Sequence, residues 1–380
     1  MLFENGRIFT EQGAFVPGWF TVEDGRFTAV EPDKVPKPAC QERTDLQGAR
    51  VIPGLVDTHI HGLLGADLSD GSAEGLLTMG RGLLRYGVTS FAPASMTLPY
   101  NVLEKAFRSA LDYRRAGRPD AARLMGIHME GPFFSMAKKG AQNPDYLRDP
   151  DFDAFKRLYD GCEGLIRIVD LAAELPGAAE FAAKAAPLTT VSLAHSNASY
   201  EEARAVFDAG ATHVSHLYNA MTPFHHLRPG ILGAASEDER VFAELICDGH
   251  HVSPSAVRMA FKLFPGRIIL VTDALRCMGM PEGEYTLGGQ RIILKDGLAR
   301  LTDGTVAGAA TGLFTALANA IRFGIPESEA IPAATLRPAR AIGADHEIGS
   351  LKAGKLADFL LVSDAWQLKE VFLGGRRCLI

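Results

Sequence analysis

The middle of the chain alternates between short apolar runs and longer stretches rich in alanine, leucine, glutamate and arginine. Apolar runs of this length are typical of buried strands, and the longer stretches are typical of helices. Eight units in which a strand precedes a helix favour an α/β barrel with parallel strands, which we expect over residues 51–344. The predicted strands are 51–56, 88–92, 124–129, 166–171, 189–194, 213–215, 242–247 and 267–272, and the predicted helices include 73–86, 102–116, 178–186 and 200–209.

A doubly wound open sheet is the alternative arrangement for the same pattern. That fold usually carries a GxGxxG fingerprint between its first strand and the following helix, and no such fingerprint opens a helix in this sequence. The barrel is therefore the preferred prediction.

Both ends of the chain have the pattern of strands. Asp24 and Gly25 separate two apolar segments, 20–23 and 27–30, which predicts a hairpin. Residues 354–362 and 370–375 also have the pattern of strands. Because chain termini commonly lie close together, we expect residues 1–50 and 345–380 to form one small β domain. A further strand-rich patch predicts a β-hairpin insertion in the barrel near residues 283–306.

Charge and cysteine content narrow the possible partners. The formal net charge of −6 argues against a nucleic-acid partner, because binding a phosphate backbone requires a clustered positive surface. The sequence opens without an apolar run and contains no stretch of about 18 apolar residues, so we expect neither a secretion signal nor a membrane partner. The five cysteines are scattered without metal-type spacing, which is typical of a cytoplasmic protein and leaves histidine and carboxylate side chains as metal ligands.

Two histidines follow the first predicted strand. His59 and His61 point the same way, because side chains two residues apart in a strand share a face, and they can address one metal ion. Two surface histidines are the alternative.

Glu130 follows the third predicted strand, and its two oxygens can bridge two cations. The alternative is a glutamate that is neutralised by a nearby arginine. His128 shares the face of Glu130, and we expect it to have a packing or supporting role.

Further polar residues follow the fifth, sixth and eighth predicted strands. His195 and His216, together with Glu130, form a set of two imidazoles and one carboxylate that leaves an open position on a catalytic metal. Asp273 is the candidate general acid and base, and an aspartate that caps the next helix is the alternative. Because barrel active sites form at the carboxyl ends of the strands, we expect these residues to converge. The fourth strand offers no lysine, so Glu130 must bridge if two metals bind.

Longer motifs extend along almost the whole chain. They are PGLVDTHIHG from residue 53, HMEGPF from 128, KKGAQNP from 138, AHSNA from 194, HLYNAM from 216, ICDGHHV from 246 and VTDALR from 271, with a closing segment over 334–358. In these motifs the sequence resembles the amidohydrolase superfamily, and within it the deacetylases of amino-sugar phosphates. HMEGPF with HLYNAM is specific to that family, whereas PGxxDxHxH and the closing segment occur through much of the superfamily. The resemblance implies a (β/α)8 TIM-like barrel, a small β-sandwich formed by both termini, and a homodimer.

The resemblance also implies roles for individual residues. It assigns one or two divalent ions (Zn, Fe, Mn or Co) to the barrel, with Asp273 as the catalytic acid and base. The predicted metal ligands are His59, His61, Glu130, His195, His216 and Asp273, and the predicted substrate contacts are Ala141, Gln142, Asn219, Ala220, Arg228, His251, Val306, Ala307 and Gly308.

Two positions depart from the family pattern. Gln142 stands where some members have a histidine that assists the substrate carbonyl, and it can donate a hydrogen bond but carries no charge. Leu227 stands where the family has an arginine that grips the substrate phosphate. An arginine follows one place later, and we expect the loop to adjust so that Arg228 contacts the phosphate.

The function that the resemblance implies is hydrolysis of the acetamide of N-acetylglucosamine 6-phosphate, which releases acetate and glucosamine 6-phosphate in amino-sugar catabolism. Related amidohydrolases that act on N-acetylgalactosamine 6-phosphate or on an N-acyl amino acid are the first alternative. A non-catalytic binding protein on a barrel scaffold is the second. Loss of ligands would indicate that class, and here every expected ligand is present.

Overall fold

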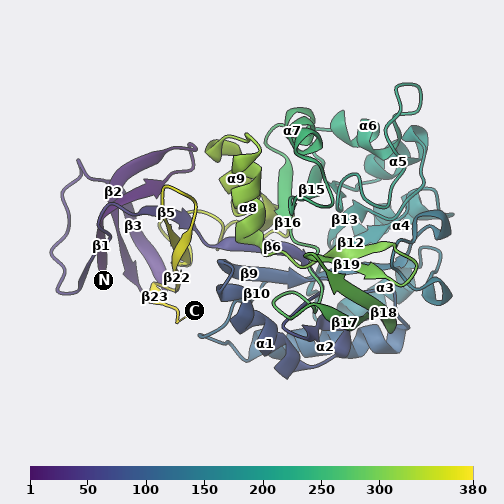
Figure 1. Ribbon diagram of the computed structural model, residues 1–380, viewed down its shortest axis with the longest axis horizontal. Coiled ribbons are helices and arrows are strands. Elements are labelled where there is room, and N and C mark those ends of the chain that lie inside the picture. Colours follow the sequence, from purple (N-terminus) through teal and green to yellow (C-terminus); the bar gives the residue numbers. More distant parts are fainter. Residues whose placement is uncertain (380) are drawn as a thin grey trace.

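The computed structural model describes residues 1–379 of the chain. Its centre holds parallel strands in two sheets, which confirms the predicted α/β class (Figure 1). The three-stranded sheet has the order β10-β9-β6, and the six-stranded sheet runs from β11 to β16 in sequence order. These strands are β6 (Leu55–Ile60), β9 (Val88–Pro93), β10 (Arg123–Leu124), β11 (Ile127–Phe133), β12 (Ile166–Leu171), β13 (Thr190–Leu193), β14 (His213–Val214), β15 (Phe242–Ile246) and β16 (Ile268–Val271).

Isolated parallel bridges connect the two sheets. One joins Ala94, directly after β9, to His128 in β11, and the other joins Ile60 in β6 to Ala274 after β16. The central strands are buried on both faces; all four residues of β16, for example, are buried. Burial on both sides explains why these strands appear in the sequence as continuous apolar runs rather than alternating ones.

Helices follow the parallel strands and cover them on the outside (Figure 1). In α5, Ser199 and Glu202 form a capping box, and Ala203, Val206 and Phe207 are buried in the main hydrophobic core. Among the helices that the structure describes, none has the length and apolar composition needed to cross a bilayer. The helices are α1 (Ala73–Leu84), α2 (Tyr100–Arg115), α3 (Phe152–Gly161), α4 (Ala178–Ala185), α5 (Tyr200–Asp208), α6 (Gly230–Ser236), α7 (Pro254–Leu263), α8 (Leu313–Arg322), α9 (Glu327–Ala333) and α10 (Leu336–Ala341), with short 3-10 turns at Leu68–Asp70, Met136–Lys138 and Pro144–Tyr146.

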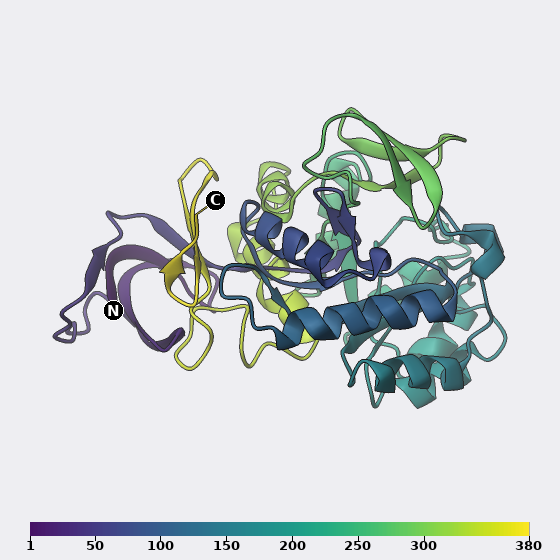
Figure 2. The same ribbon diagram turned by 90° about the horizontal axis from the view of Figure 1, so that it is seen from below.

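Both ends of the chain contribute strands to one further sheet, which lies at one end of the molecule (Figures 1 and 2). Phenylalanine rings from both ends hold it together: Phe3 contacts Phe20, Phe359 and Phe372 with ring centroids 4.9–5.7 Å apart. The predicted hairpin is present, with Glu23 paired to Arg26. The strands are β1 (Leu2–Phe9), β2 (Phe15–Glu23), β3 (Arg26–Pro32), β4 (Arg43–Asp45), β5 (Arg50–Pro53), β21 (Phe359–Val362), β22 (Leu368–Leu373) and β23 (Arg376–Arg377).

The bounds of two predicted strands were wrong. The predicted strand 51–56 is divided at Gly54, where the chain passes from β5 in the terminal sheet to β6 in the parallel sheet. A Cβ atom at Gly54 would lie 2.1 Å from the Thr89 hydroxyl, so the close approach that permits this crossing requires glycine. The predicted strand 124–129 is likewise divided between β10 and β11.

A four-stranded antiparallel sheet follows β16 and projects above the parallel strands in Figure 2. Its buried residues, which include Leu287, Ile292 and Leu301, pack in a small core together with Met96 and Leu275 from the loops after β9 and β16. A bridge between Ala274 and Ala309 places the end of this sheet beside the end of β16. Its strands are β17 (Gly283–Leu287), β18 (Gln290–Lys295), β19 (Leu298–Leu301) and β20 (Val306–Ala309); a second short antiparallel pair, β7 (Gly62–Leu63) and β8 (Ala66–Asp67), follows β6.

Candidate metal centre and active site

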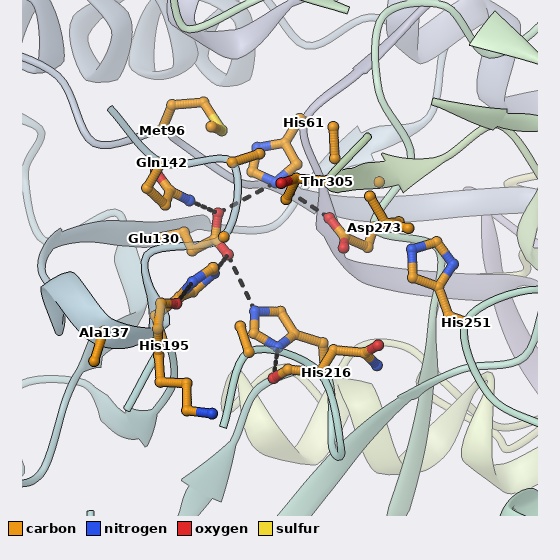
Figure 3. A pocket seen from close by; sticks show the side chains of 18 residues that line it. His61, Met96, Glu130, Ala137, Gln142, His195, His216, His251, Asp273 and Thr305 are labelled. Carbon is orange, nitrogen blue, oxygen red and sulfur yellow. Dashed lines mark hydrogen bonds and ion pairs between the residues drawn. The ribbon is translucent and has the colours of Figure 1, made fainter. Parts of the chain in front are cut away.

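A cavity of about 340 Å³ opens where the parallel strands end (Figure 3). Its walls come from the loops after β6, β9, β11, β13, β14, β15 and β16 and from β20 with the residue before it. Glu130, which was expected to follow its strand, lies inside β11, because that strand continues to Phe133. The lining residues are His61, Met96, Glu130, Ala137, Lys138, Gly140, Ala141, Gln142, His195, His216, Asn219, Ala220, His251, Asp273, Thr305, Val306, Ala307 and Gly308.

Glu130 lies at the centre of this arrangement (Figure 3). Its Oε1 atom lies 3.1 Å from His195 Nε2 and 3.3 Å from His216 Nε2. Its Oε2 atom lies 3.3 Å from His61 Nε2. The carboxylate therefore belongs to two groups of possible metal ligands, one with His195 and His216 and the other with His59 and His61.

The geometry of both groups fits a divalent cation. Ligands at about 2.0–2.2 Å from a tetrahedral ion lie about 3.4 Å from one another. The separations of 3.1–3.6 Å between Glu130 oxygens and the histidine Nε2 atoms match that spacing. In addition, His59 Nε2 is buried without a hydrogen-bond partner, and a cation would satisfy it. The residues present therefore fit a divalent cation.

The charges of the site attract a cation. Burial lowers the pKa of His61, but the carboxylates of Glu130 and Asp273 raise it by more, to about 10. Burial raises the pKa of Glu130, but the surrounding histidines, His61 foremost, hold the pKa of that carboxyl well below its usual range. A divalent ion bound among these groups takes the place of the protons that the histidines would otherwise hold.

The other ring nitrogen of two histidines is held by a backbone carbonyl. His195 Nδ1 donates to the carbonyl of Lys138 at 2.9 Å, and His216 Nδ1 donates to the carbonyl of Asn219 at 3.2 Å. These bonds fix the tautomer, so each Nε2 atom carries the free electron pair toward Glu130. Metal-binding histidines are usually held in this way.

Three of these residues have a strained backbone. His195, His216 and Asp273 have positive φ angles of 45°, 32° and 49°. A non-glycine residue in this region costs about 1–3 kcal/mol and persists only where the surrounding structure enforces it. Each is the second residue after the end of a parallel strand, so the unusual turn directs the side chain into the cavity rather than along the strand.

Asp273 is held next to the histidine pair. Its Oδ1 atom lies 3.3 Å from His61 Nε2, and its backbone N–H donates to the carbonyl of His59 at 2.9 Å. Burial raises the pKa of Asp273, but His61 and His59 lower it by more, so the carboxylate is ionised and can accept a proton. The helix-capping alternative is wrong, because the next helix is α8 and its N-cap is Gly312.

Gln142 contacts Glu130 directly. Its amide nitrogen donates to Glu130 Oε2 at 2.8 Å, and its amide oxygen accepts from the backbone N–H of Thr97 at 2.7 Å. The side chain is only 2% exposed. The bond to Thr97 holds the amide in place, and the amide in turn orients the shared carboxylate of Glu130. The sequence pattern did not indicate this contact between Gln142 and Glu130.

The structure gathers most of the predicted substrate contacts but not Arg228. Eight of the nine line the cavity: Ala141, Gln142, Asn219, Ala220, His251, Val306, Ala307 and Gly308. Arg228 lies outside that lining, on an exposed turn closed by a backbone hydrogen bond from its N–H to the carbonyl of His225. Lys138 was missed; it is the one lysine or arginine among the residues that line the cavity. The paired lysines before Gly140 were the available signal.

His128 lies below the cavity and is fully buried. Its Nδ1 donates to the carbonyl of Thr58 at 2.9 Å, and its Nε2 lies 3.0 Å from Asp170 Oδ2. Nδ1 is therefore held by a hydrogen bond and Nε2 faces the Asp170 carboxylate, in keeping with the supporting role expected from the sequence.

Comparisons with known proteins agree with this geometry. The model of the amidohydrolase family matches residues 50–378. The chain is 34% identical to an N-acetylgalactosamine-6-phosphate deacetylase of Escherichia coli O157:H7 over 97% of either chain. It is 33% identical to an N-acetylglucosamine-6-phosphate deacetylase of Vibrio furnissii, covering 93% of this chain and 88% of the relative.

A solved structure has the same fold. It is a mutant N-acetyl-D-glucosamine-6-phosphate deacetylase from Mycobacterium smegmatis in complex with N-acetyl-D-glucosamine-6-phosphate. The two chains superpose with a TM-score of 0.91 at 32% identity, covering 99% of this chain and 98% of the other.

Proposed function

Because the chain belongs to the amidohydrolase family, we propose that it removes the acetyl group from N-acetylglucosamine 6-phosphate and releases acetate and glucosamine 6-phosphate. One observation carries this proposal: Glu130 is shared by two groups of histidines, and Asp273 lies beside them in a cavity lined in part by Thr305 and by residues 306–308 of β20. The similarity to deacetylases of amino-sugar phosphates along nearly the whole chain supports the substrate class.

The reaction is an amide hydrolysis in which the chain handles one proton. A bound divalent cation polarises the carbonyl and lowers the pKa of water, which is the chemistry that the metal supplies. Asp273 accepts a proton from the attacking water while the oxygen of that water adds to the acetyl carbonyl carbon. Asp273 then returns that proton to the sugar nitrogen as the C–N bond breaks, so the amine leaves neutral.

The ligand groups favour two ions rather than one. His195, His216 and Glu130 would hold the first, and His59, His61 and Glu130 would hold the second, with Asp273 beside them. Zinc, iron, manganese and cobalt all suit imidazole and carboxylate ligands. Metal analysis of the purified protein would identify the ion.

The remaining cavity residues hold the sugar phosphate. Asn219, His251 and the segment 306–308 face the cavity, and His251 Nδ1 donates to Asp248 Oδ2 at 2.7 Å, which fixes its ring. The curated relatives named above act on either the galactosamine or the glucosamine epimer, and N-acetylgalactosamine 6-phosphate is therefore the second candidate substrate. Acetate release from both sugars and from N-acetyl amino acids tests the proposal, and activity confined to the amino acids would refute it.

We also propose the architecture that goes with this activity. The bridges at both edges of the parallel sheets support a (β/α)8 barrel over residues 51–344 with the insertion near 283–306. The sheet shared by both termini supports a small β-sandwich domain of residues 1–50 and 345–380. The five cysteines are free, which supports a cytoplasmic location, and the family resemblance supports a homodimer.

Replacing Arg228 with alanine tests phosphate recognition. If the exposed turn closes over the bound substrate, kcat/KM for the 6-phosphate should fall about 10–150-fold, because a charged hydrogen bond contributes about 1.5–3 kcal/mol. The value for the unphosphorylated sugar should not change. Steady-state kinetics on both sugars provide the measurement.

Lys138→Ala is the matched variant, because Lys138 already lines the cavity. If only this variant loses the preference for the 6-phosphate, Lys138 rather than Arg228 holds the phosphate. The predicted role of Arg228 is contradicted if Arg228→Ala has the same kcat/KM as the wild type for both sugars.

A further inference from the structure

Glu244 is a buried carboxylate in the middle of β15, below the cavity and outside its lining. It has no exposed surface, so it cannot touch a substrate. Three histidines surround it: its Oε2 atom lies 2.7 Å from His59 Nδ1, and its Oε1 atom lies 3.8 Å from His128 Nδ1 and from His213 Nε2. An ionised group in an apolar strand needs a specific reason, because burying a charge is costly.

The contact with His59 fixes the orientation of that ring. His59 Nδ1 donates to Glu244 Oε2, so the free electron pair of the imidazole is on Nε2. That atom lies 3.6 Å from Glu130 Oε1 and 3.9 Å from Asp273 Oδ1, and it has no hydrogen-bond partner. Glu244 therefore directs the unpartnered nitrogen of His59 at the two carboxylates that face the cavity.

His59 differs from the other candidate ligands in what holds it. His195 and His216 donate to neutral backbone carbonyls, whereas His59 donates to a carboxylate. A carboxylate makes the imidazole a stronger ligand and adds negative charge close to the cation. His61 Nδ1 has no hydrogen-bond partner, so His59 is the anchored member of its pair.

A separate ion among His59, His128 and Glu244 is the other arrangement that their spacing permits. It would require His128 to release a ring nitrogen, yet Nδ1 donates to the Thr58 carbonyl and Nε2 pairs with Asp170. It would also take His59 Nδ1 from its short bond to Glu244. The existing hydrogen bonds therefore oppose a third ion below the cavity.

We propose that Glu244 is a positioning residue that acts through His59 and sets the affinity of the second cation, the one held by His59, His61 and Glu130. Glu244 Oε2 also accepts a longer hydrogen bond, 3.4 Å, from the backbone N–H of His216, but it does not contact the ring of His216, which is held by the Asn219 carbonyl. The cation held by Glu130, His195 and His216 should therefore depend on Glu244 much less. This inference rests on the metal groups of the proposed function, but it concerns ion binding and not the identity of the substrate.

The test compares metal binding by the wild type and by Glu244→Gln, which keeps the size of the side chain and removes its charge. Both proteins are stripped with a chelator and titrated with Zn²⁺ or Co²⁺ while bound metal is counted by mass spectrometry and the cobalt absorption spectrum is recorded. We expect two ions per wild-type chain. In the variant we expect one ion at wild-type affinity and a second bound about 10–100-fold more weakly.

Asp170→Asn is the matched control. It also removes a buried carboxylate that pairs with a histidine, but Asp170 contacts His128 and Ser215 and none of the candidate ligands. We expect this variant to bind both ions as the wild type does, even if its melting temperature falls. The comparison separates positioning of His59 from a general loss of stability.

Glu244→Asp provides a second variant in case the glutamine protein does not fold. It keeps the negative charge among the three histidines but withdraws the oxygen from His59 Nδ1, so the second ion should again bind more weakly. Two ions at wild-type affinity in a folded variant, or only one ion in the wild type, would overturn the proposal. If the wild type binds two ions but does not deacetylate amino-sugar phosphates, the proposed function fails while this inference stands.

Discussion

Replacing Asp273 with asparagine should lower kcat for deacetylation by about 10²–10⁴-fold, the usual contribution of a general acid and base. The side chain keeps its size, but an amide cannot accept the proton of the attacking water or return it to the amine. Asp273 Oδ1 lies 3.3 Å from His61 Nε2 at the edge of the cavity, close enough to the metal groups to serve the reacting atoms. Steady-state kinetics measured beside metal analysis provide the test.

Two measurements make this result specific. Metal content and the melting temperature of Asp273→Asn should stay near the wild-type values, since the ligand groups on both sides of Glu130 remain. Asp170→Asn should show the reverse pattern: breaking the buried pair with His128 lowers stability, while turnover at the assay temperature is retained. Near-normal turnover in Asp273→Asn would remove this residue from the proton-transfer role.

Removing the divalent cation should abolish turnover and also destabilise the fold. Without the cation, water keeps a pKa of about 15.7 rather than one near 7, and Asp273 alone cannot activate it. A ligand present at about 1,000 times its Kd stabilises the folded state by about 4 kcal/mol. For a chain of 380 residues we expect the melting temperature to fall by several degrees.

The experiment follows activity and melting of the same sample before and after dialysis against a chelator. Zn²⁺, Fe²⁺, Mn²⁺ and Co²⁺ are then added back one at a time, and the ion that restores both properties is the functional one. Glu130→Gln should resemble the stripped protein even with metal present, because Glu130 belongs to both ligand groups. Full turnover by a protein shown to contain no metal contradicts the proposed mechanism.

The alternation of apolar runs with helical stretches was sufficient to predict the α/β class. Strand β12 has the predicted bounds, 166–171. The bounds near Gly54 could not be predicted, because β5 and β6 form a continuous apolar run and only their pairing with different sheets separates them. The local hydrophobic pattern indicates that a segment is buried, but it does not indicate which strand or sheet the segment packs against.

The candidate ligands could be proposed from the sequence for a related reason. Parallel strands bring their carboxyl ends to one edge, so a polar residue at the end of an apolar strand is placed in space by its position in the chain. His195 and His216 follow this rule, whereas Glu130 lies inside the longer strand β11. The structure brings Glu130 Oε1 to 3.1 Å from His195 Nε2 and 3.3 Å from His216 Nε2.

What the sequence determined by itself is the class of fold, the family and the residues that follow the strand ends, since each is expressed in local pattern or in continuous motifs. The tertiary structure alone decided which other side chains orient the candidate ligands. Gln142 contacts Glu130 across a loop, Arg228 lies outside the cavity, and Glu244 meets His59 across 185 residues. In the sequence, Glu244 is one charged residue within an otherwise apolar strand. Its partner depends on how distant strands are arranged around the interior, which no short stretch of sequence specifies.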